Sequence, residues 1–446
     1  MLSLVALELI WHITGVAWAE VGARTAALAL MVVVAPRFGL REWAMTAIAI
    51  GLASALLLRP GGLAPATEAL RSGAFFSAFI LSMMLLRQAA MTSDSVLRVG
   101  EWITRQPPGR RFYTIWFGGH FAGILLNFGA VSLLAPLIQR GVRVAEADPH
   151  RQAILERRQL SALIRGFSPV IAWSPTTLTQ VIILASVPGL GPGAAIAMGL
   201  GLSALMLVIA RVEDRLHWGR PRSSGPVPDF PRRAGLDLAF VYALLVAGAV
   251  TVVFLLDGAL PVALMTVAPV ILIGWIFAQA RLGTLEKQGA AARLRQIALV
   301  AVPATARDAF LLGAAGFVGI SAAHLAPVPE MAAWIEDTNV PAWLIVAAIP
   351  ALITLGGQIA LSPMVMVVFL AAVVQALPIL PAPPAVIAVA LSAGWALSMT
   401  AAPNSTGAIL ISGATGVATT TFTWHWNGLY SLAVLVALTT LFWIAV

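Results

Sequence analysis

The chain has 446 residues, of which 60% are hydrophobic and 10% charged, and its mean hydropathy is +0.92. No soluble core needs that much apolar sequence, so the composition indicates a polytopic membrane protein and excludes an ordinary soluble domain. Cysteine is absent from the sequence, which excludes disulfides, thiolate nucleophiles and cysteine metal sites.

Taken in chain order, the apolar stretches predict a series of helices, some of which are too short to cross a bilayer. Pieces such as 111–125 and 363–377 fall below the about 20 residues that a spanning helix needs, so each predicts one leg of a re-entrant hairpin. Met1 begins a run without a cationic start region, so we expect a retained first helix. The predicted elements are helices at 2–19, 22–36, 42–58 and 72–86, a broken pair at 111–139, a broken helix at 158–188, helices at 193–211, 235–256, 260–281 and 308–325, a broken pair at 340–377, a broken helix at 384–419 and a last span at 427–446.

The order of these elements repeats within the chain. Phe75 precedes Asn127 by the same number of residues as Phe310 precedes Ser362. Further along, an interrupted helix recurs, with Pro175 matching Pro403. The predicted fold class is therefore an all-α polytopic membrane protein of about 11 transmembrane segments plus two re-entrant hairpins, arranged in two inverted repeats with broken helices. The predicted domains are N-terminal scaffold helices at 1–71, a first repeat at 72–211, a cytoplasmic linker at 212–234, scaffold helices with an interfacial helix at 235–307 and a second repeat at 308–446.

The positive charge predicts the orientation in the membrane. The net charge is +8, and Lys287 is the sole lysine, so the basic residues are nearly all arginines between apolar spans. Such arginines are a topology signal, and we expect no nucleic-acid partner. They favour a bacterial-type inner membrane location with a cytoplasmic N-terminus and an external C-terminus, and the two hairpins then enter from opposite faces. The arginine-rich loops are 87–111, 140–165, 211–233 and 281–307.

The interruptions point to a binding cavity. A helix broken in lipid leaves backbone groups unpaired unless protein, water or a ligand pairs them, so breaks are tolerated where they line a cavity. Half-helices that start after Asn127, Pro175, Ser362 and Pro403 aim the positive ends of their dipoles there, which favours an anion. The predicted substrate-binding residues are Asn127, Gly129, Ser174, Pro175, Thr176, Thr177, Ser362, Pro363, Pro403, Asn404, Ser405 and Thr406. The predicted ion-binding residues, for sodium held with freed carbonyls, are Asn127, Ser168, Thr179, Gln358, Thr400 and Asn404.

Three stretches resemble a known superfamily of ion transporters. The run FAGILLNFGAVSLLAPLI at 121–138 is similar to its first hairpin, ALSMTAAPNSTGAIL at 396–410 to its second broken helix, and WSPTTLTQVII at 173–183 to the first-half equivalent. The order of spans resembles the divalent anion/sodium symporters, although only Asn127 and Ser362 match the Ser-Asn-Thr hairpin tips of that family. The resemblance implies a homodimer in which the hairpin domain slides across a fixed scaffold.

These observations favour a secondary active transporter of a small, carboxylate-like organic anion, coupled to sodium or protons, with an elevator-type mechanism. The alternative is a sodium/proton antiporter, which lacks support because no Asp or Glu lies at the four breaks. A membrane enzyme is disfavoured by the absence of a nucleophile and base arrangement, an HExxH motif or a phosphate loop in the sequence. We expect no cofactor beyond possible Na⁺, and the lipid bilayer as a partner.

Charged groups within the spans are few, and each has two interpretations. His120 is the best proton-carrying candidate. Arg165 either attracts the anion or reaches to lipid headgroups. Glu8 and His12 lie four residues apart on one helix face, which suits a proton relay or, more simply, an interfacial or interhelical pair.

Overall fold

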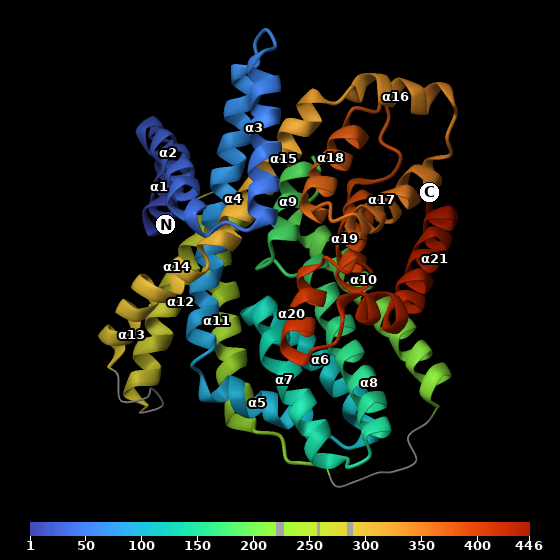
Figure 1. Cartoon of the computed structure of the whole chain (residues 1–446). Helices are drawn as coiled ribbons and strands as arrows, with labels where there is room; N and C mark the ends of the chain where they lie inside the picture. The colour runs from blue at the N-terminus through green and yellow to red at the C-terminus, as the bar shows by residue number, and fades with distance from the viewer. Residues whose placement is uncertain (220–226, 257–258, 283–288) are drawn as a thin grey trace. The chain divides into compact units, whose positions relative to one another are not determined.

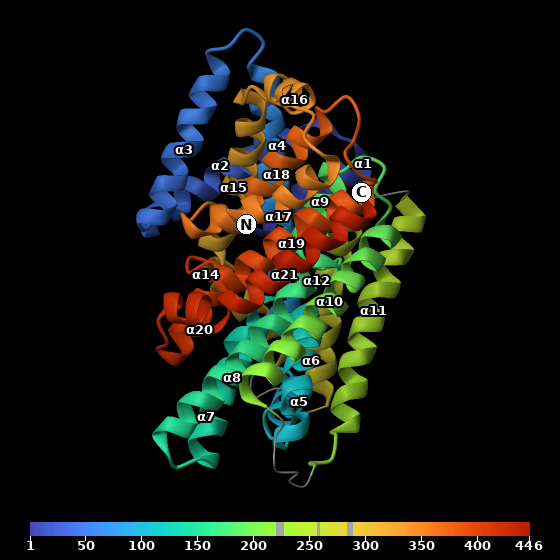
Figure 2. The same cartoon turned by 90° about the vertical axis from the view of Figure 1, so that its right-hand side faces the viewer.

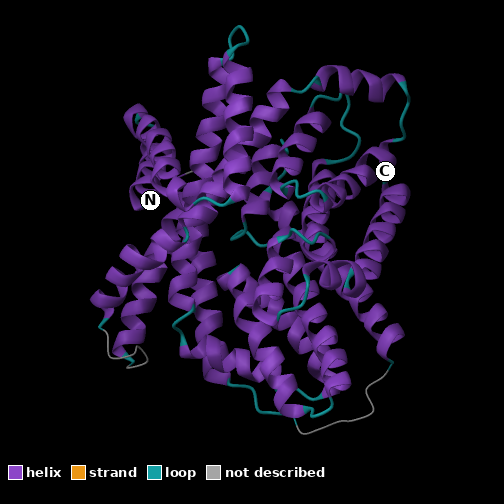
Figure 3. Ribbon diagram, in the orientation of Figure 1, coloured by secondary structure: helices purple, strands orange, loops and turns teal. Residues whose placement is uncertain are grey.

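The computed structural model describes residues 1–219, 227–256, 259–282 and 289–446, and within them every regular element is helical. Figure 1 labels the helices, Figure 2 gives a second view, and Figure 3 draws all the described elements in purple without a strand. The predicted all-α membrane fold is therefore confirmed. In the described part, nine helices are long and apolar enough to cross a membrane: Ala17–Arg37, Leu40–Leu57, Leu63–Ala90, Pro192–Trp218, Arg232–Leu256, Leu260–Arg281, Ala306–Leu325, Pro384–Thr415 and Gly428–Ala445.

Packing divides the chain into two compact units. Unit 1 comprises 1–93, 239–335 and 364–378, and unit 2 comprises 94–238, 336–363 and 379–446. Each unit thus collects segments from both halves of the sequence. The units are defined by packing and the predicted repeats by sequence symmetry, so the predicted domain boundaries stay a prediction.

Unit 1 holds the early helices together with helices from the middle of the chain. Helix α4 packs against α12 and α15, and α15 also packs against α3. Residues 283–288, which belong to the predicted interfacial helix at 282–300, lie outside the described residues. The helices of unit 1 are α1 (Leu2–Thr14), α2 (Ala17–Val34), the 3₁₀ helix η1 (Ala35–Arg37), α3 (Leu40–Leu57), α4 (Leu63–Ala90), most of α11 (Arg232–Leu256), α12 (Leu260–Arg281), α13 (Ala290–Gln296), the π-helix η3 (Ile297–Ala301), α14 (Val302–Ala304), α15 (Ala306–Leu325), most of α16 (Val328–Asp337) and most of α18 (Pro363–Gln375).

The predicted boundary between the first two helices is wrong. Hydropathy predicts spans at 2–19 and 22–36, whereas α1 ends at Thr14 and α2 begins at Ala17. Gly15 adopts φ 68°, and its N–H donates to the Trp11 carbonyl at 2.8 Å, which is a left-handed helix cap. The apolar run continues through this turn, so hydropathy alone does not mark it.

Two glycines allow α4 and α15 to cross closely. A Cβ on Gly73 would lie 2.9 Å from the Gly313 carbonyl oxygen, and one on Gly313 would lie 2.7 Å from the Gly73 carbonyl oxygen. The Ser77 hydroxyl donates to the Ala309 carbonyl at 2.9 Å across the same crossing. Small residues at a membrane helix crossing let the backbones approach and pack.

We expect Gly73→Ala to lower the free energy of unfolding by about 1–3 kcal/mol, because the added methyl forces the two backbones apart. Gly51→Ala is the matched control, since no described atom would lie within 4 Å of its Cβ on α3. That control should gain up to about 1 kcal/mol from helix propensity. Thermal unfolding of both variants checks the crossing, and equal effects would contradict it.

Unit 2 holds the interrupted helices. Helices α7 and α8 lie side by side, as Figure 2 shows, and α6 also packs along α8. The short helix α5 was not predicted, because its 11 residues include charged side chains and do not form an apolar run long enough for a membrane span. The helices of unit 2 are α5 (Asp94–Thr104), α6 (Pro108–Leu126), α7 (Phe128–Ala145), α8 (Pro149–Phe167), the 3₁₀ helix η2 (Ser168–Ala172), α9 (Leu178–Ser186), α10 (Pro192–Trp218), α17 (Ala342–Gln358), α19 (Pro384–Ala401), α20 (Thr406–Thr415), the π-helix η4 (Thr421–Trp426) and α21 (Gly428–Ala445).

Both predicted hairpins are interrupted near the expected tips. Helix α6 ends at Leu126 and α7 begins at Phe128, so the first break is the single residue Asn127. Helix α17 ends at Gln358 and α18 begins at Pro363. The chain passes from unit 2 to unit 1 at this second break, which the hairpin prediction did not anticipate.

Candidate functional site

Unit 2 contains both predicted broken helices. In the first, α8 continues into η2, residues 173–177 leave the helix, and α9 starts at Leu178. In the second, α19 ends at Ala401 and α20 starts at Thr406. Proline cannot donate an N–H to a helix, and Pro175 and Pro403 lie within these interruptions. The helix η2 packs against α19, so the two broken helices contact each other.

Hydroxyl groups bind the interruption of the first broken helix, residues 173–177, to neighbouring protein groups. Thr176 Oγ1 donates to the Ile124 carbonyl of α6 at 2.9 Å and lies 2.8 Å from Ser174 Oγ. Thr177 Oγ1 donates to the Ser174 carbonyl at 2.8 Å. All three side chains are buried. Their hydroxyls therefore hold the broken segment in place against the end of α6.

A side-chain amide holds the interruption of the second broken helix, between α19 and α20, in place. Gln358 Nε2 donates to the Ala401 carbonyl at 3.1 Å, and its Oε1 accepts from Trp424 Nε1 at 2.9 Å. Ser405 caps α20, because its Oγ accepts from the Ala408 N–H at 3.3 Å and donates to the Met399 carbonyl at 3.2 Å. Each broken helix is thus fastened to the C-terminal end of one predicted hairpin leg, α6 or α17.

Two asparagines at the breaks have free amides. Asn127 is half-buried and adopts φ 50° and ψ −132°, a positive-φ backbone outside the αL well that favours glycine. Asn404 is exposed. Neither side-chain amide has a hydrogen-bond partner among the residues that the structure describes. At the second tip, Ala360 also has a positive φ, of 64°.

All the predicted site residues fall within unit 2. Those that are exposed or half-buried can meet a ligand without repacking, whereas the buried ones support the backbone. The exposed or half-buried group is Asn127, Pro175, Ser362, Pro363, Asn404, Thr406 and Gln358. The buried group is Gly129, Ser168, Ser174, Thr176, Thr177, Thr179, Thr400, Pro403 and Ser405.

Several carbonyls freed by the breaks are already paired with side chains. The Ala172 carbonyl accepts from Gln180 Nε2, in the same way as the Ile124 and Ala401 carbonyls accept from Thr176 and Gln358. Thr400 Oγ1 donates to the Leu397 carbonyl and lies 2.8 Å from Ser431 Oγ. Within the described residues, no group of three or more His, Asp or Glu side chains could hold a metal ion. Each of these carbonyls keeps a second lone pair, so a sodium ion there would share it with a protein donor.

His120 is fixed in a neutral form by its neighbours. Nδ1 lies 2.9 Å from the Gly166 carbonyl, and Nε2 accepts from Trp173 Nε1 at 3.0 Å. One nitrogen therefore carries the proton and the other is occupied by a donor. The ring stacks against Trp116 and Trp173, with centroids 4.9 and 5.6 Å apart. These contacts make His120 a structural residue and argue against the prediction that it carries protons.

We expect His120→Gln to lower the free energy of unfolding by about 1–3 kcal/mol, because buried partners lose their hydrogen bonds. The pH dependence of anion binding should stay as in the wild type. Binding measured between pH 5 and 9 checks this expectation. A shift of the pH midpoint by a full unit would return His120 to the proton pathway.

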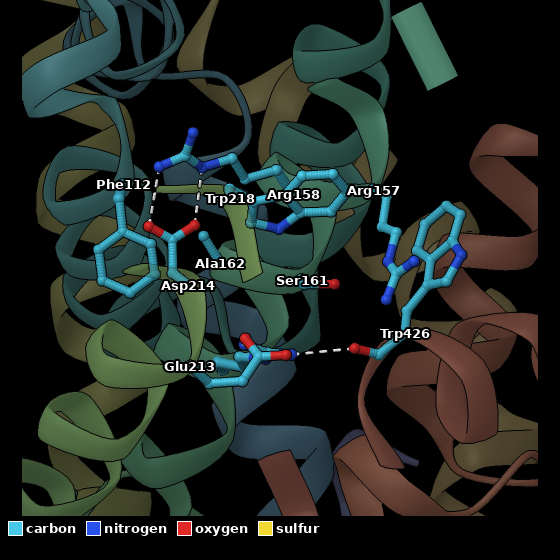
Figure 4. Close-up of a pocket in the computed structure, with 10 residues that line it drawn as sticks. Phe112, Arg157, Arg158, Ser161, Ala162, Glu213, Asp214, Trp218 and Trp426 are labelled. Atoms are coloured by element: carbon cyan, nitrogen blue, oxygen red, sulfur yellow. Dashed lines mark hydrogen bonds and ion pairs between the residues drawn. The ribbon is translucent and has the colours of Figure 1, made fainter. Parts of the chain in front are cut away.

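Arg165 is buried, and protein groups engage its guanidinium, which argues against both sequence interpretations. Its guanidinium pairs with Glu213 at 2.6 Å and donates to Asn427 Oδ1 at 2.8 Å. It also lies over the Tyr430 ring, 4.5 Å from the centroid. Nearby, Arg158 forms two hydrogen bonds to Asp214, shown as dashed lines in Figure 4.

Sequence reasoning missed the acidic partners in this network. Glu213 and Asp214 lie in the last turns of α10. The sequence predicts that this helix ends at 211, which assigns both residues to the cytoplasmic linker. A usable signal was present, because Arg158 and Arg165 lie two helical turns apart on one face of α8. Two arginines on a helix face that enters the membrane need acidic partners.

Glu8 and His12 pair with each other within the single helix α1 of unit 1, so this contact is not the interhelical pair that was expected. His12 Nδ1 lies 3.4 Å from Glu8 Oε2, and its ring lies 5.2 Å from that of Phe75 on α4. The pair belongs to unit 1, whereas the predicted site residues all belong to unit 2.

No family model matches the chain, and no curated protein sequence matches it either. Solved structures do. The YdaH transporter of Alcanivorax borkumensis aligns with a TM-score of 0.60 and 17% identity over 91% of this chain and 98% of that one. MtrF of Neisseria gonorrhoeae, described as one of a class of antimetabolite efflux pumps, aligns with a TM-score of 0.56 and 15% identity over 91% and 94%.

The chain has the fold of these membrane transporters. At such low identity the likeness establishes the fold alone, and it extends over nearly the whole chain. It gives no support to the divalent anion/sodium symporter family in particular. The coarser expectation, a transporter architecture, agrees with the solved structures.

Proposed function

We propose that the protein is a secondary active transporter of a small organic anion with a carboxylate-like group. The observation that carries this proposal is the pair of interrupted helices in unit 2, each fastened to the end of α6 or α17 by a side-chain hydrogen bond. Matched breaks in a membrane transporter fold favour a binding site at the breaks. The chain's fold likeness to two transporters supports the same class.

The chemistry of the breaks favours an anion. The starts of α7, α9 and α20 each carry about half a positive elementary charge, from N–H groups without helical partners. Asn127 and Asn404 add amide donors that no described protein group uses. No acidic side chain lies in residues 173–177 or 402–405, so nothing there repels a carboxylate.

The division into units supports the mechanism that we propose. All the candidate site residues belong to unit 2, which has its own compact packing. This supports an elevator-type mechanism in which unit 2 carries the substrate as a body within a homodimer, in the manner of the divalent anion/sodium symporters. MtrF is described as an efflux pump, so we propose export as well as import as the direction of transport to be tested.

Coupling to sodium or protons completes the proposal. Sodium would bind near Ser168, whose hydroxyl is fully buried without a partner among the described residues. A sodium/proton antiporter is the alternative, and it would need a titratable carboxylate that the breaks lack. We do not propose an enzymatic activity.

Thermal unfolding of the purified protein with a panel of anions tests this function. The panel comprises benzoate, succinate, methanesulfonate and sulfate, each with and without sodium and at two pH values. We expect one organic anion to raise the melting temperature, and to raise it further in sodium or at the lower pH. Stabilisation by sodium or pH alone, with no anion effect, would favour the antiporter and overturn the proposal.

A further inference from the structure

A small pocket lies beside the arginine network of unit 2, outside the helix breaks. It is formed by α6, α8, the end of α10 and the end of η4, and its lining includes Arg157, Ser161, Trp218 and Trp426 (Figure 4). Trp218 is the last residue of a candidate membrane span. Tryptophan side chains favour the level of the lipid headgroups. The pocket therefore lies where a membrane span meets the headgroup region.

The charges around this pocket do not balance. Asp214 pairs with Arg158 at 2.7 Å and with Arg211 at 2.6 Å, and Glu213 pairs with Arg165 at 2.6 Å. No described carboxylate pairs with the remaining arginine, Arg157. Its guanidinium donates to the His425 carbonyl at 3.2 Å and lies 5.4 Å from the Trp218 ring centroid. Four guanidinium groups thus face two carboxylates, which leaves an excess of positive charge.

A buried hydroxyl in the pocket is also unpaired. Ser161 is 5% exposed, and its Oγ has no hydrogen-bond partner among the described residues. Figure 4 shows this oxygen on the side where Arg157 and Trp426 lie. An unsatisfied buried hydroxyl costs free energy that a ligand atom can recover. Ser161 therefore points, independently of the charge, to a ligand with an acceptor oxygen.

We propose that Arg157 and Ser161 bind a phosphate-type oxyanion in this pocket. A guanidinium presents parallel N–H donors that match the oxygens of phosphate, and the hydroxyl donates to one more. The pocket has room for about one water-sized atom, so one phosphate oxygen enters while the rest of the group stays at the mouth. The source is a lipid headgroup or free phosphate. This site is separate from the transported anion and does not depend on the proposed transport.

Binding to the full-length protein in detergent tests this site. The probes are short-chain phosphatidylglycerol and inorganic phosphate, followed by thermal unfolding and, for the lipid, by native mass spectrometry. We expect Arg157→Gln to raise the apparent Kd about tenfold, in line with the loss of one charge-assisted interaction, and Ser161→Ala to raise it severalfold. Arg151→Gln, at an arginine 72% exposed on the same helix, should leave the Kd unchanged.

The outcomes separate the two sources. Binding of phosphatidylglycerol alone that Arg157→Gln weakens would identify a lipid headgroup site, and binding of phosphate alone would identify a free phosphate site. If Arg157→Gln does not fold, Ser161→Ala and Arg157→Lys carry the test. Unchanged binding in these variants, the same stabilisation by chloride, or no binding of either probe would overturn the proposal.

Discussion

Replacing Asn127 with glycine should weaken binding of the transported anion while the protein stays folded. Glycine adopts the observed φ of 50° without strain, so this change deletes the amide and preserves the backbone turn. The loss of one hydrogen bond to a charged ligand is worth about 1.5–3 kcal/mol, or roughly 10- to 100-fold in affinity. Asn404→Ala should lower affinity by a similar factor. Titration of the purified variants with the stabilising anion measures both.

A matched control exists elsewhere in the same unit. Asn339 has φ 48°, is exposed and lies in the loop between α16 and α17, so it is not part of any helix break. Asn339→Gly makes the same chemical change, and we expect it to leave the affinity unaltered. Wild-type affinity in both Asn127→Gly and Asn404→Ala would reject the assignment of the site to the breaks.

Removing the charge of Arg165 should give the largest loss of stability in unit 2. The side chain is 3% exposed and neutralises Glu213, which is 14% exposed. Arg165→Met leaves that carboxylate and Asn427 without their partner in a buried setting. Breaking a buried ion pair on one side costs about 3–5 kcal/mol. Thermal or denaturant unfolding in detergent measures the change.

Two comparisons isolate the cause of that loss. Arg98→Met breaks a surface pair whose members are 67% and 46% exposed, and such pairs contribute about 0–1 kcal/mol. The double variant Arg165→Met with Glu213→Met removes both charges and should recover part of the stability. An Arg165→Met protein as stable as Arg98→Met would show that the pair is not structurally important.

The sequence predicts the helices well where hydropathy changes sharply. Helix α12 matches its predicted span of 260–281, and the break at Asn127 lies where it was expected. Helix α1 differs because Gly15 turns the chain inside an uninterrupted apolar run. The membership of the two units is likewise not encoded in local pattern, because α4 and α15 meet through glycines from distant parts of the chain.

The candidate site was predicted only in part. Proline and asparagine mark the breaks in the sequence, because Pro175 and Pro403 each remove a helical hydrogen bond and stand beside small polar residues. The partners of the breaks were not predictable, since Thr176 and Gln358 reach carbonyls on other helices. The role of His120 also depends on its hydrogen bond from Trp173 Nε1. No sequence pattern predicts that these two side chains lie close together.

Anion flux into proteoliposomes tests the central claim most directly. Vesicles containing the protein would be given a sodium or pH gradient and radiolabelled benzoate or succinate, whichever stabilises the protein. We expect accumulation above the external concentration that depends on the gradient, persists in Asn339→Gly and is lost when Asn127→Gly and Asn404→Ala are combined. Flux no faster than in empty vesicles, or equal flux in the combined variant, would contradict the account.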